Sequence, residues 1–232
     1  PAAKPATAVA VTARLTVENA DERTWVSRGA HKLIGALDTF AIDVAGRRCL
    51  DAGASTGGFT EVLLDRGAAE VVAVDVGYGQ LAWSLRSDAR VQVIERTNVR
   101  DLTPDAIGGQ VDMIVADLSF ISLATVLPAL IGCAAPDADI VPMVKPQFEV
   151  GRSQVGAGGV VSDPQLRAES MLAVAARAAT LGWPPVGVTA SPLPGPSGNV
   201  EYFLWLRART DAALAGQTLQ DAVRRAVAEG PQ

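Results

Sequence analysis

A glycine-rich turn in the first quarter of the chain has the residue types of a cofactor-binding loop. The segment Asp51-Ala-Gly-Ala-Ser-Thr-Gly-Gly-Phe59 joins an apolar, strand-like run to a helical one. Gly53 permits a sharp turn where a Cβ atom would clash, and Gly57 and Gly58 let the backbone approach whatever lies on the turn. The free N–H groups of the following helix can bind a ligand. Asp75 follows about 20 residues later, where nucleotide-binding βαβ units carry the carboxylate for a ribose. Together these residues predict an adenosine-containing cofactor.

The spacing within the turn bears on the kind of cofactor. The dinucleotide pattern G-x-G-x-x-G is not met, because Ser55 stands at its second glycine. The phosphate loop is not met either, because Phe59 stands where that loop requires a lysine. A turn without a pyrophosphate pattern favours a cofactor without phosphates, of which S-adenosylmethionine is the common one. The alternative is a turn that is rich in glycine for packing alone.

Four ionisable residues are candidates for chemistry beside this turn. Asp117 and Lys145 end apolar, strand-like runs, and Glu201 lies near the start of the last such run. Ligands of parallel α/β sheets bind outside the carboxyl ends of the strands, so these three residues share that edge if the last strand is antiparallel. Lys32, on a helix before the turn, is the fourth candidate. The alternatives are a snorkelling side chain for Lys145 and a solvated helix face for Lys32.

Alternating strands and helices are predicted to position these residues. The apolar runs indicate strands at 48–53, 71–76, 91–97, 111–118, 138–145, 186–190 and 199–207. Helical periodicity and helix-end signals indicate helices at 30–40, 57–66, 80–86, 123–135 (interrupted by Pro128), 164–182 and 212–229, with a long glycine-rich loop at 146–162. The expected fold is therefore α/β: a doubly wound, mostly parallel seven-stranded sheet with an antiparallel last strand.

Composition excludes several classes of protein. Hydrophobic residues make up 49% and charged residues 19% of the 232 residues, which is typical of a globular domain. No apolar run is long enough to span a membrane, and no signal peptide opens the chain. Cys49 and Cys133 lie in apolar runs and are interpreted as buried small hydrophobes in a reducing compartment. His31 is the only histidine, which argues against a zinc site and a Ser-His-Asp triad. The net charge of −5 disfavours nucleic-acid binding by bulk charge, but not by a local basic patch.

Several motifs together resemble one known family. The chain looks like the TlyA family, whose catalytic domain is similar to the FtsJ-type RNA ribose methyltransferases. The segments that carry this resemblance are Arg23-Thr-Trp-Val26, Ser27-Arg-Gly-Ala-His-Lys-Leu33, Asp51-Ala-Gly-Ala-Ser-Thr-Gly-Gly-Phe-Thr60, Ala116-Asp-Leu-Ser-Phe-Ile121, Val144-Lys-Pro-Gln-Phe-Glu149 and Gly195-Pro-Ser-Gly-Asn-Val-Glu201.

The resemblance implies a domain organisation. Members of the family carry an N-terminal RNA-binding S4 domain joined to the catalytic domain by a short linker. Residues 1–22 are then the remnant of a truncated S4 domain, 23–26 are the interdomain linker, and 27–232 are an S-adenosylmethionine-dependent methyltransferase domain with a Rossmann-like class I fold.

The resemblance also implies a reaction. The enzyme would methylate the 2′-hydroxyl of cytidine ribose in 16S and 23S ribosomal RNA, in the cytoplasm, as a monomer and without a metal. Lys32, Asp117, Lys145 and Glu201 fall on the family's Lys-Asp-Lys-Glu tetrad. A lysine can remove the hydroxyl proton only when neutral, which burial and a second cation favour. Lys145 is the expected base, with Asp117 and Glu201 orienting the amines.

The binding residues are expected at the same edge of the sheet. The residues expected to hold the cofactor are Gly53, Ala54, Ser55, Thr56, Gly57, Gly58, Phe59, Asp75, Val76, Asn98, Asp117 and Leu118. Those expected to contact RNA are Arg28, Arg96, Arg100, Phe120 and Arg152, through phosphate contacts and, for Phe120, stacking on a splayed base. The alternatives are surface charges for the arginines and a core aromatic for Phe120.

The sequence argues against three other functions. A short-chain dehydrogenase using NAD(P) needs Tyr-x-x-x-Lys, but Ala82 follows Tyr78 and Leu206 follows Tyr202 at that spacing. A base-amine methyltransferase usually shows two prolines and an aromatic residue after the acid at 117, and this chain lacks those prolines. A haemolysin, the name given to some family members, needs an element that inserts into a membrane, and none is evident in the sequence.

Overall fold

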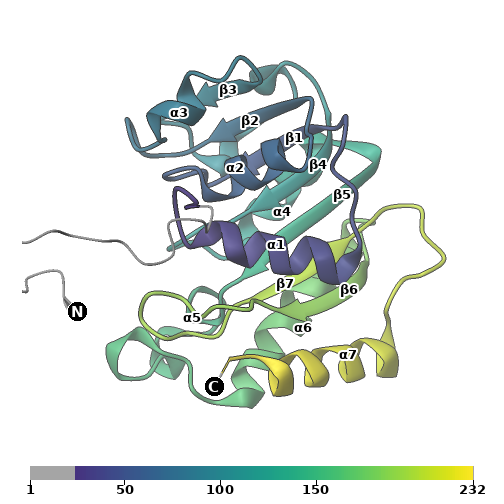
Figure 1. Ribbon diagram of the computed structural model, residues 1–232. Helices are drawn as coiled ribbons and strands as arrows, with labels where there is room; N and C mark the ends of the chain where they lie inside the picture. Colours follow the sequence, from purple (N-terminus) through teal and green to yellow (C-terminus); the bar gives the residue numbers. More distant parts are fainter. Residues whose placement is uncertain (1–23, 232) are drawn as a thin grey trace, which may run out of the picture.

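Seven strands form one sheet in the order β3-β2-β1-β4-β5-β7-β6 (Figure 1). The computed structural model describes residues 24–231. The expected S4 remnant at 1–22 and Arg23 of the expected linker therefore lie outside the described residues. The strands are β1 (Arg48–Ala52), β2 (Glu70–Val74), β3 (Val91–Ile94), β4 (Val111–Ala116), β5 (Ala134–Val144), β6 (Pro185–Ala190) and β7 (Tyr202–Leu206).

The direction of the strands confirms the expected topology. β1 pairs in parallel with β2 and β4, β2 with β3, and β4 with β5. β7 lies between β5 and β6 and is antiparallel to both. The chain therefore enters β7 at the edge of the sheet where β4 and β5 end. This brings the residue before β7, Glu201, to the same edge as Asp117 and Lys145.

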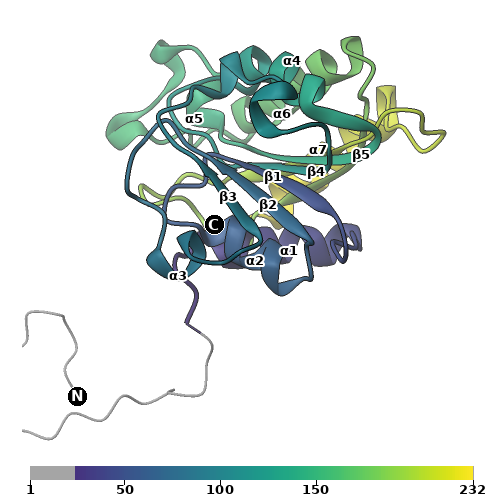
Figure 2. The same ribbon diagram turned by 90° about the horizontal axis from the view of Figure 1, so that it is seen from above.

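Helices cover both faces of the sheet (Figure 2). α1 (Gly29–Phe40), α2 (Gly58–Asp65) and α3 (Trp83–Arg86) lie on one face. α4 (Leu123–Cys133) and α6 (Pro164–Thr180) lie on the other, and α7 (Gly216–Glu229) packs beside α6 and β6. A one-turn helix, α5 (Pro146–Glu149), directly follows Lys145. Short 3₁₀ turns complete the connections at Val99–Asp101, Asp105–Ile107, Arg152–Gln154 and Ala157–Gly159.

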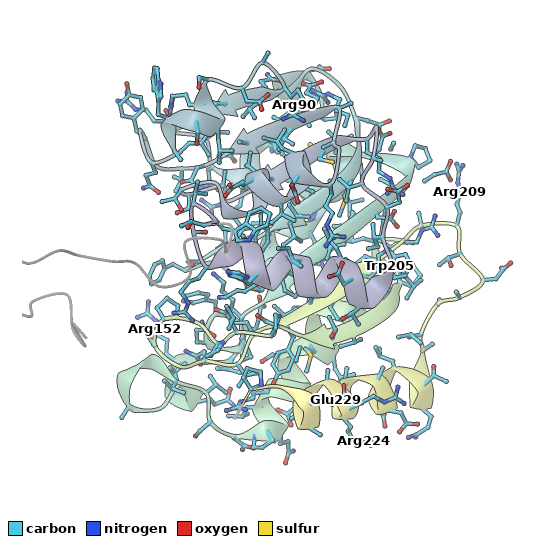
Figure 3. The ribbon with its side chains drawn as sticks, viewed as in Figure 1. Arg90, Arg152, Trp205, Arg209, Arg224 and Glu229 are labelled. Atoms are coloured by element: carbon cyan, nitrogen blue, oxygen red, sulfur yellow. The ribbon has the colours of Figure 1, made fainter. Side chains whose placement is uncertain are left out.

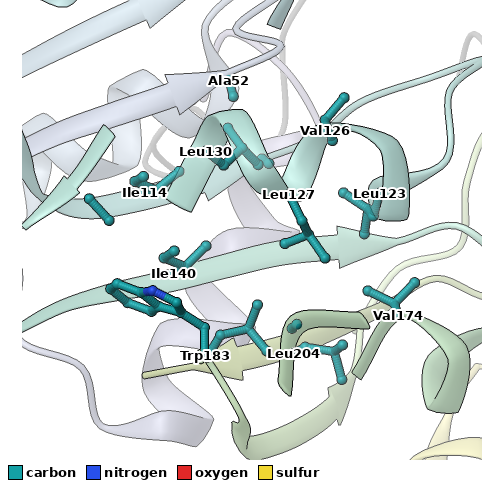
Figure 4. Close-up of a cluster of buried hydrophobic side chains, with 14 of the residues drawn as sticks. Ala52, Ile114, Leu123, Val126, Leu127, Leu130, Ile140, Val174, Trp183 and Leu204 are labelled. Atoms are coloured by element: carbon teal, nitrogen blue, oxygen red, sulfur yellow. The ribbon is translucent and has the colours of Figure 1, made fainter. Parts of the chain in front are cut away.

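The hydrophobic core is divided by the sheet into two clusters. On the α4 and α6 face, fully buried side chains such as Leu127, Leu130 and Ile140 pack together (Figure 4). On the other face, Leu33 and Leu37 of α1 pack over Leu63 of α2 and the sheet. Because apolar residues of the central strands are buried on both faces, those strands are continuous hydrophobic runs, as the sequence indicated.

Some element boundaries differ from the predicted ones. α4 is not interrupted at Pro128 but runs through it, because Val126, Leu127 and Leu130 remain anchored in the core. β5 begins at Ala134, directly after α4, and its pairing with β4 contains a register shift. The segment 146–162 is not a plain loop, because it begins with α5. The other ends move by four residues or fewer.

The composition also led to expectations about the cysteines, membrane spans and metal sites. Cys49 and Cys133 are both buried, as expected, and burial raises the pKa of the Cys49 thiol to about 12. No helix among residues 24–231 is long and apolar enough to cross a membrane. Over the same residues, no three His, Cys, Asp or Glu side chains are grouped in a way that could hold a metal ion.

Candidate active site

The glycines of the turn after β1 make room mainly for other parts of the protein. A Cβ atom on Gly53, whose φ is +88°, would lie 2.5 Å from the carbonyl oxygen of Asp117. At Gly57, with φ +102°, it would overlap the side chain of Leu85, and at Gly58 it would overlap Oγ of Ser27. The close approach expected of Gly57 and Gly58 is thus an approach to α3 and to the start of α1.

Asp75 fixes the shape of this turn. Its Oδ2 accepts a hydrogen bond from the backbone N–H of Ser55 at 2.8 Å, and its Oδ1 accepts one from Gly77 at 2.6 Å. Ser55 is in the left-handed region, with φ +49°. Each carboxylate oxygen has two lone pairs, so Asp75 can still accept hydrogen bonds from a ligand hydroxyl.

A cavity of about 590 Å³ opens beside the turn. This volume is in the range of small-molecule sites. Seven residues predicted to bind the cofactor line it: Gly53, Ser55, Asp75, Val76, Asn98, Asp117 and Leu118. The sequence did not indicate Gln80, Thr97, Val99, Ser119, Ile121 and Val126, which also line it. Several of these residues are next in sequence to predicted ones. They could have been predicted by including the residues that follow the end of each strand.

A second cavity, of about 270 Å³, adjoins the first. All four candidate catalytic residues line it: Lys32, Asp117, Lys145 and Glu201. The other predicted cofactor residues, Ala54, Thr56, Gly58 and Phe59, lie along this cavity, whereas Gly57 lines neither. The residues that also line this cavity and were not predicted are Ser27, Gly29, Ser119, Pro194 and Pro196.

The four candidate residues form two ion pairs. Nζ of Lys32 lies 2.5 Å from Oε2 of Glu201, and both residues are buried. Nζ of Lys145 lies 2.5 Å from Oδ1 of Asp117, whose side chain is 26% exposed. Nζ of Lys145 also donates a hydrogen bond to Oγ of Ser119 at 3.0 Å. The Lys32–Glu201 pair is thus buried, whereas the Lys145–Asp117 pair is partly exposed to solvent.

A glycine allows a loop to cover the buried pair. A Cβ atom on Gly195 would lie 2.7 Å from Oε1 of Glu201, so only glycine lets the proline-rich loop approach this carboxylate. Asn199 anchors the same region: its Oδ1 accepts from the N–H of Val161 at 2.9 Å, and its Nδ2 donates to the carbonyl of Gly159 at 2.8 Å. The end of the 146–162 segment is thereby tied to the chain that leads into β7.

The two cavities share one wall. Gly53, Ser55, Asp117 and Ser119 line both of them. A group that passes from a molecule in one cavity to a molecule in the other must cross this boundary. Lys145 and Glu201 both line the smaller cavity alone, but the amine of Lys145 contacts Asp117 and Ser119, which line both cavities.

Asp51, at the end of the first β-strand before the turn, is an unusual buried acid. Its Oδ2 accepts a hydrogen bond from Oγ1 of Thr60 at 2.6 Å, and its Oδ1 has no hydrogen-bond partner among the described residues. Burial raises its pKa to about 7, and the nearby Asp117 charge adds to the effect. No role was predicted for this side chain, although it opens the turn motif.

The residues expected to contact RNA do not form one patch. Arg28 lines the smaller cavity and donates to the carbonyl of Pro194 at 3.2 Å. Arg100 lines the larger cavity. Arg96 lies over the ring of Tyr78, 4.2 Å from its centre. Arg152, which is labelled in Figure 3, is exposed and lines neither cavity.

Phe120 is not a core aromatic residue. Its side chain is 91% exposed at the mouth of the larger cavity, and its backbone has φ +63°, which is strained for a residue with a Cβ atom. Its ring contacts that of Phe148, with 5.1 Å between the ring centres. An aromatic ring held outward in this way is available for stacking on another planar group.

Comparison with known proteins identifies the family. Residues 25–208 match the family model of the FtsJ-like methyltransferases. The chain belongs to the FtsJ-like methyltransferase family. This family membership, together with the sheet order, accounts for a cavity at the ends of β1, β2 and β4.

Relatives within the family are close. The chain is 77% identical over 231 residues to a Mycobacterium tuberculosis protein named 16S/23S rRNA (cytidine-2′-O)-methyltransferase TlyA, covering 100% of this chain and 86% of that protein. It is 35% identical over 182 residues to a Campylobacter jejuni protein named 23S rRNA (cytidine-2′-O)-methyltransferase TlyA, covering 78% and 70%. A solved structure that carries the name hemolysin, from Lactococcus lactis, aligns with a TM-score of 0.81 and 40% identity, covering 87% of this chain and 97% of that chain. As an FtsJ-like methyltransferase, the chain is an enzyme, which confirms the class expected from its sequence.

Proposed function

We propose that the chain transfers a methyl group from S-adenosylmethionine to the 2′-hydroxyl of a cytidine ribose in 16S and 23S ribosomal RNA, with Lys145 as the general base. The observation that carries this proposal is the pair of adjoining cavities. One has the size of a nucleoside cofactor site, and the other is lined by both lysines and both acids of the candidate tetrad.

The residues around the larger cavity suit S-adenosylmethionine. Asp75 directly follows β2 and has lone pairs available for ribose hydroxyls, and Leu118 and Val126 offer apolar surface for an adenine ring. The turn at Gly53 to Ser55 would hold the methionine end near the shared wall. When bound, this cofactor supplies a methyl group on a sulfonium, which needs a nucleophile on the far side of the methyl carbon.

Lys145 is positioned to accept the proton of that nucleophile. A ribose hydroxyl attacks poorly unless its proton is taken as the new bond forms. Nζ of Lys145 lies in the smaller cavity, against Asp117 of the shared wall, so it can accept the proton of a hydroxyl bound in that cavity. Lys32 and Glu201 add a buried ion pair to the same cavity, which fixes the second amine there.

The choice of lysine at position 145 supports a proton-transfer role. The chain has three lysines and 17 arginines, and Lys32 and Lys145 are the two lysines among the described residues. A guanidinium would make equally good ion pairs, but it does not give up its proton in proteins. Lysine at position 145 is therefore best explained by a need for a neutral amine.

The names of the relatives and the edge of the site support the RNA substrate. Both named TlyA relatives are cytidine-2′-O-methyltransferases of ribosomal RNA. Arg28 lines the smaller cavity and Arg100 the larger one. Phe120 is exposed at the larger cavity, where an unpaired base could stack on it. We assign Arg96 and Arg152 to phosphate contacts farther along the strand.

The test compares arginine and alanine at the two lysines. We expect Lys145→Arg and Lys145→Ala to lower kcat to a similar extent, by about 10²–10⁴-fold, because neither side chain can accept the proton. We expect Lys32→Arg to retain most activity, because it keeps the charge next to Glu201. Methyl transfer from labelled S-adenosylmethionine to isolated 30S and 50S subunits provides the measurement.

Cofactor binding is measured separately on the same variants. Calorimetry with S-adenosylmethionine should give binding to Lys145→Arg as well as to the unaltered chain, and titration with NAD should give no heat. An active Lys145→Arg variant would reject Lys145 as the base. Heat with NAD and none with S-adenosylmethionine would reject the cofactor.

A further inference from the structure

Ser119 stands at the boundary of the two cavities without an evident structural task. It is exposed, and within residues 24–231 its hydroxyl makes one hydrogen bond, accepted from Nζ of Lys145 at 3.0 Å. It caps no helix, a task that Ser122 performs for α4 by accepting from the N–H of Ala124. A contribution to stability therefore does not explain why a serine stands at this position.

The geometry around Lys145 supplies an explanation. A neutral lysine amine has two N–H bonds and one lone pair, arranged tetrahedrally with the bond to Cε. Oδ1 of Asp117 lies 2.5 Å from Nζ and Oγ of Ser119 lies 3.0 Å from it. The contact with Oδ1 of Asp117 is an ion pair without hydrogen-bond geometry, whereas the contact with Ser119 is a hydrogen bond. One N–H therefore points to Ser119, the charge of Asp117 favours the second N–H on its own side, and the lone pair is left with a single direction.

The geometry points to Ser119 as a positioning residue for the base, which rests on the proposed function of Lys145. With only the charge of Asp117 beside it, a neutral amine can rotate about the Cδ–Cε and Cε–Nζ bonds and direct its lone pair elsewhere. The hydrogen bond to Ser119 removes that freedom. Ser119 therefore aims the lone pair of Lys145 at the 2′-hydroxyl in the smaller cavity, and acts on the reaction through Lys145.

The location of Ser119 agrees with this role. It lines both cavities, together with Gly53, Ser55 and Asp117, so its hydroxyl lies beside the path that the methyl group must cross. The backbone that presents it is held on both sides. Asp117 continues from β4 by donating its N–H to the carbonyl of Ala52 at 3.0 Å, and Glu149 accepts from the N–H of Leu123 at 2.8 Å. The loop that carries Ser119 is thus anchored to β1 at one end and to α5 at the other.

The experiment measures kcat and KM for Ser119→Ala and Ser119→Thr. Losing one uncharged hydrogen bond that orients the base should lower kcat by about tenfold in Ser119→Ala. The KM values for S-adenosylmethionine and for ribosomal subunits should stay unchanged, because neither is held by this hydroxyl. Ser119→Thr keeps a hydroxyl on the same carbon, and the exposed position has room for its methyl group, so kcat should return close to that of the unaltered chain.

A control variant and the lysine variant make the result decisive. Ser84→Ala removes another exposed serine hydroxyl, from α3, that lines neither cavity, and should leave kcat unchanged. An unchanged kcat in Ser119→Ala, or a raised KM for S-adenosylmethionine with no change in kcat, would overturn the role of Ser119. If Lys145→Arg is inactive in the same assay, the proposed function survives that outcome. If Lys145→Arg is active, the proposed function itself fails.

Discussion

Asp51 shows how a single buried carboxyl can make stability depend on pH. It is fully buried at the end of β1, and burial, opposed by the Thr60 hydrogen bond, raises its pKa to about 7. The folded protein therefore holds a proton on Asp51 at pH values where the unfolded chain has released it. Near pH 4 and below, folding gains from this protonated state, and the gain is lost as the pH rises through 7.

We expect this to be visible in the variant Asp51→Asn, which cannot ionise. Between pH 7 and pH 4, the free energy of unfolding of the unaltered chain should rise relative to that of the variant, by about 4 kcal/mol for a pKa shift of about three units. Urea unfolding at a series of pH values measures the difference. Asp211→Asn, at an exposed aspartate, serves as the control and should show no such trend. A difference that does not vary with pH would contradict the raised pKa.

Single residues were the most predictable part of the site. Asp117 and Lys145 could be assigned to one edge because each directly follows a buried parallel strand. Ser119 could not be assigned, because its contact with Lys145 depends on how the loop after β4 turns, which one sequence does not specify. No role was predicted for Asp51 for a similar reason. An acid inside an apolar strand indicates burial, but its hydrogen-bond partner Thr60 comes from the neighbouring helix, and the sequence does not specify that contact.

At the level of elements, Glu149 joins two short segments of the site. Its Oε1 accepts from the N–H of Leu123 and its Oε2 from Oγ of Ser122 at 2.6 Å, so it caps the start of α4 from the end of α5. Burial raises the pKa of this carboxyl. One side chain thereby connects the loop with Asp117 and Phe120 to the turn that begins at Lys145.

We expect Glu149→Ala to lower the free energy of unfolding by about 2 kcal/mol at neutral pH, because it removes a helix cap and leaves polar groups without a partner. Glu149→Gln retains an acceptor and should cost less. Urea unfolding is the measurement, with Glu229→Ala on the exposed side of α7 as the control (Figure 3). Equal stability of Glu149→Ala and Glu229→Ala would show that the cap contributes nothing.

Elements were predicted well in kind and less well in extent. The alternation of strands and helices is evident from periodicity, and all seven strands were expected. Pro128 suggested a break in α4, but burial of the residues on either side outweighs the lost backbone hydrogen bond. The glycines at 57 and 58 suggested a ligand, whereas their immediate neighbours are Leu85 and Ser27. Local patterns cannot distinguish a close approach to a ligand from a close approach to another helix.

At the scale of the whole molecule, Asp139 connects several segments at the end of the sheet opposite the candidate site. This buried residue of β5 lies 2.5 Å from Nη1 of Arg47 and 3.1 Å from Nε of Arg207, and it accepts a hydrogen bond from Nε1 of Trp205 at 2.7 Å. It therefore joins β5, β7 and the chain that enters β1. Lys145 lies six residues farther along, about 20 Å away in an extended strand.

Because of that separation, we expect stability and cofactor binding to respond differently to Asp139→Asn. The variant keeps an acceptor for Trp205 but loses the charge that pairs with two partly exposed arginines, so the free energy of unfolding should fall by about 2 kcal/mol. The Kd for S-adenosylmethionine should stay unchanged in calorimetry. Asp137→Asn, at an exposed position of the same strand, is the matched control. A weakened cofactor affinity in Asp139→Asn alone would show that the two ends of the sheet are coupled.

The position of β7 in the sheet determines the order in which the two cavities can form during synthesis. The larger cavity is built entirely from residues between 53 and 126, so the strands around it can pair while the rest of the chain is still being made. The smaller cavity needs Glu201, which arrives only with the last strand, and β7 must then enter between β5 and β6. Lys32 pairs with Glu201, 169 residues later in the chain. The larger cavity, which is the proposed cofactor site, can thus form before the smaller cavity has its complete lining.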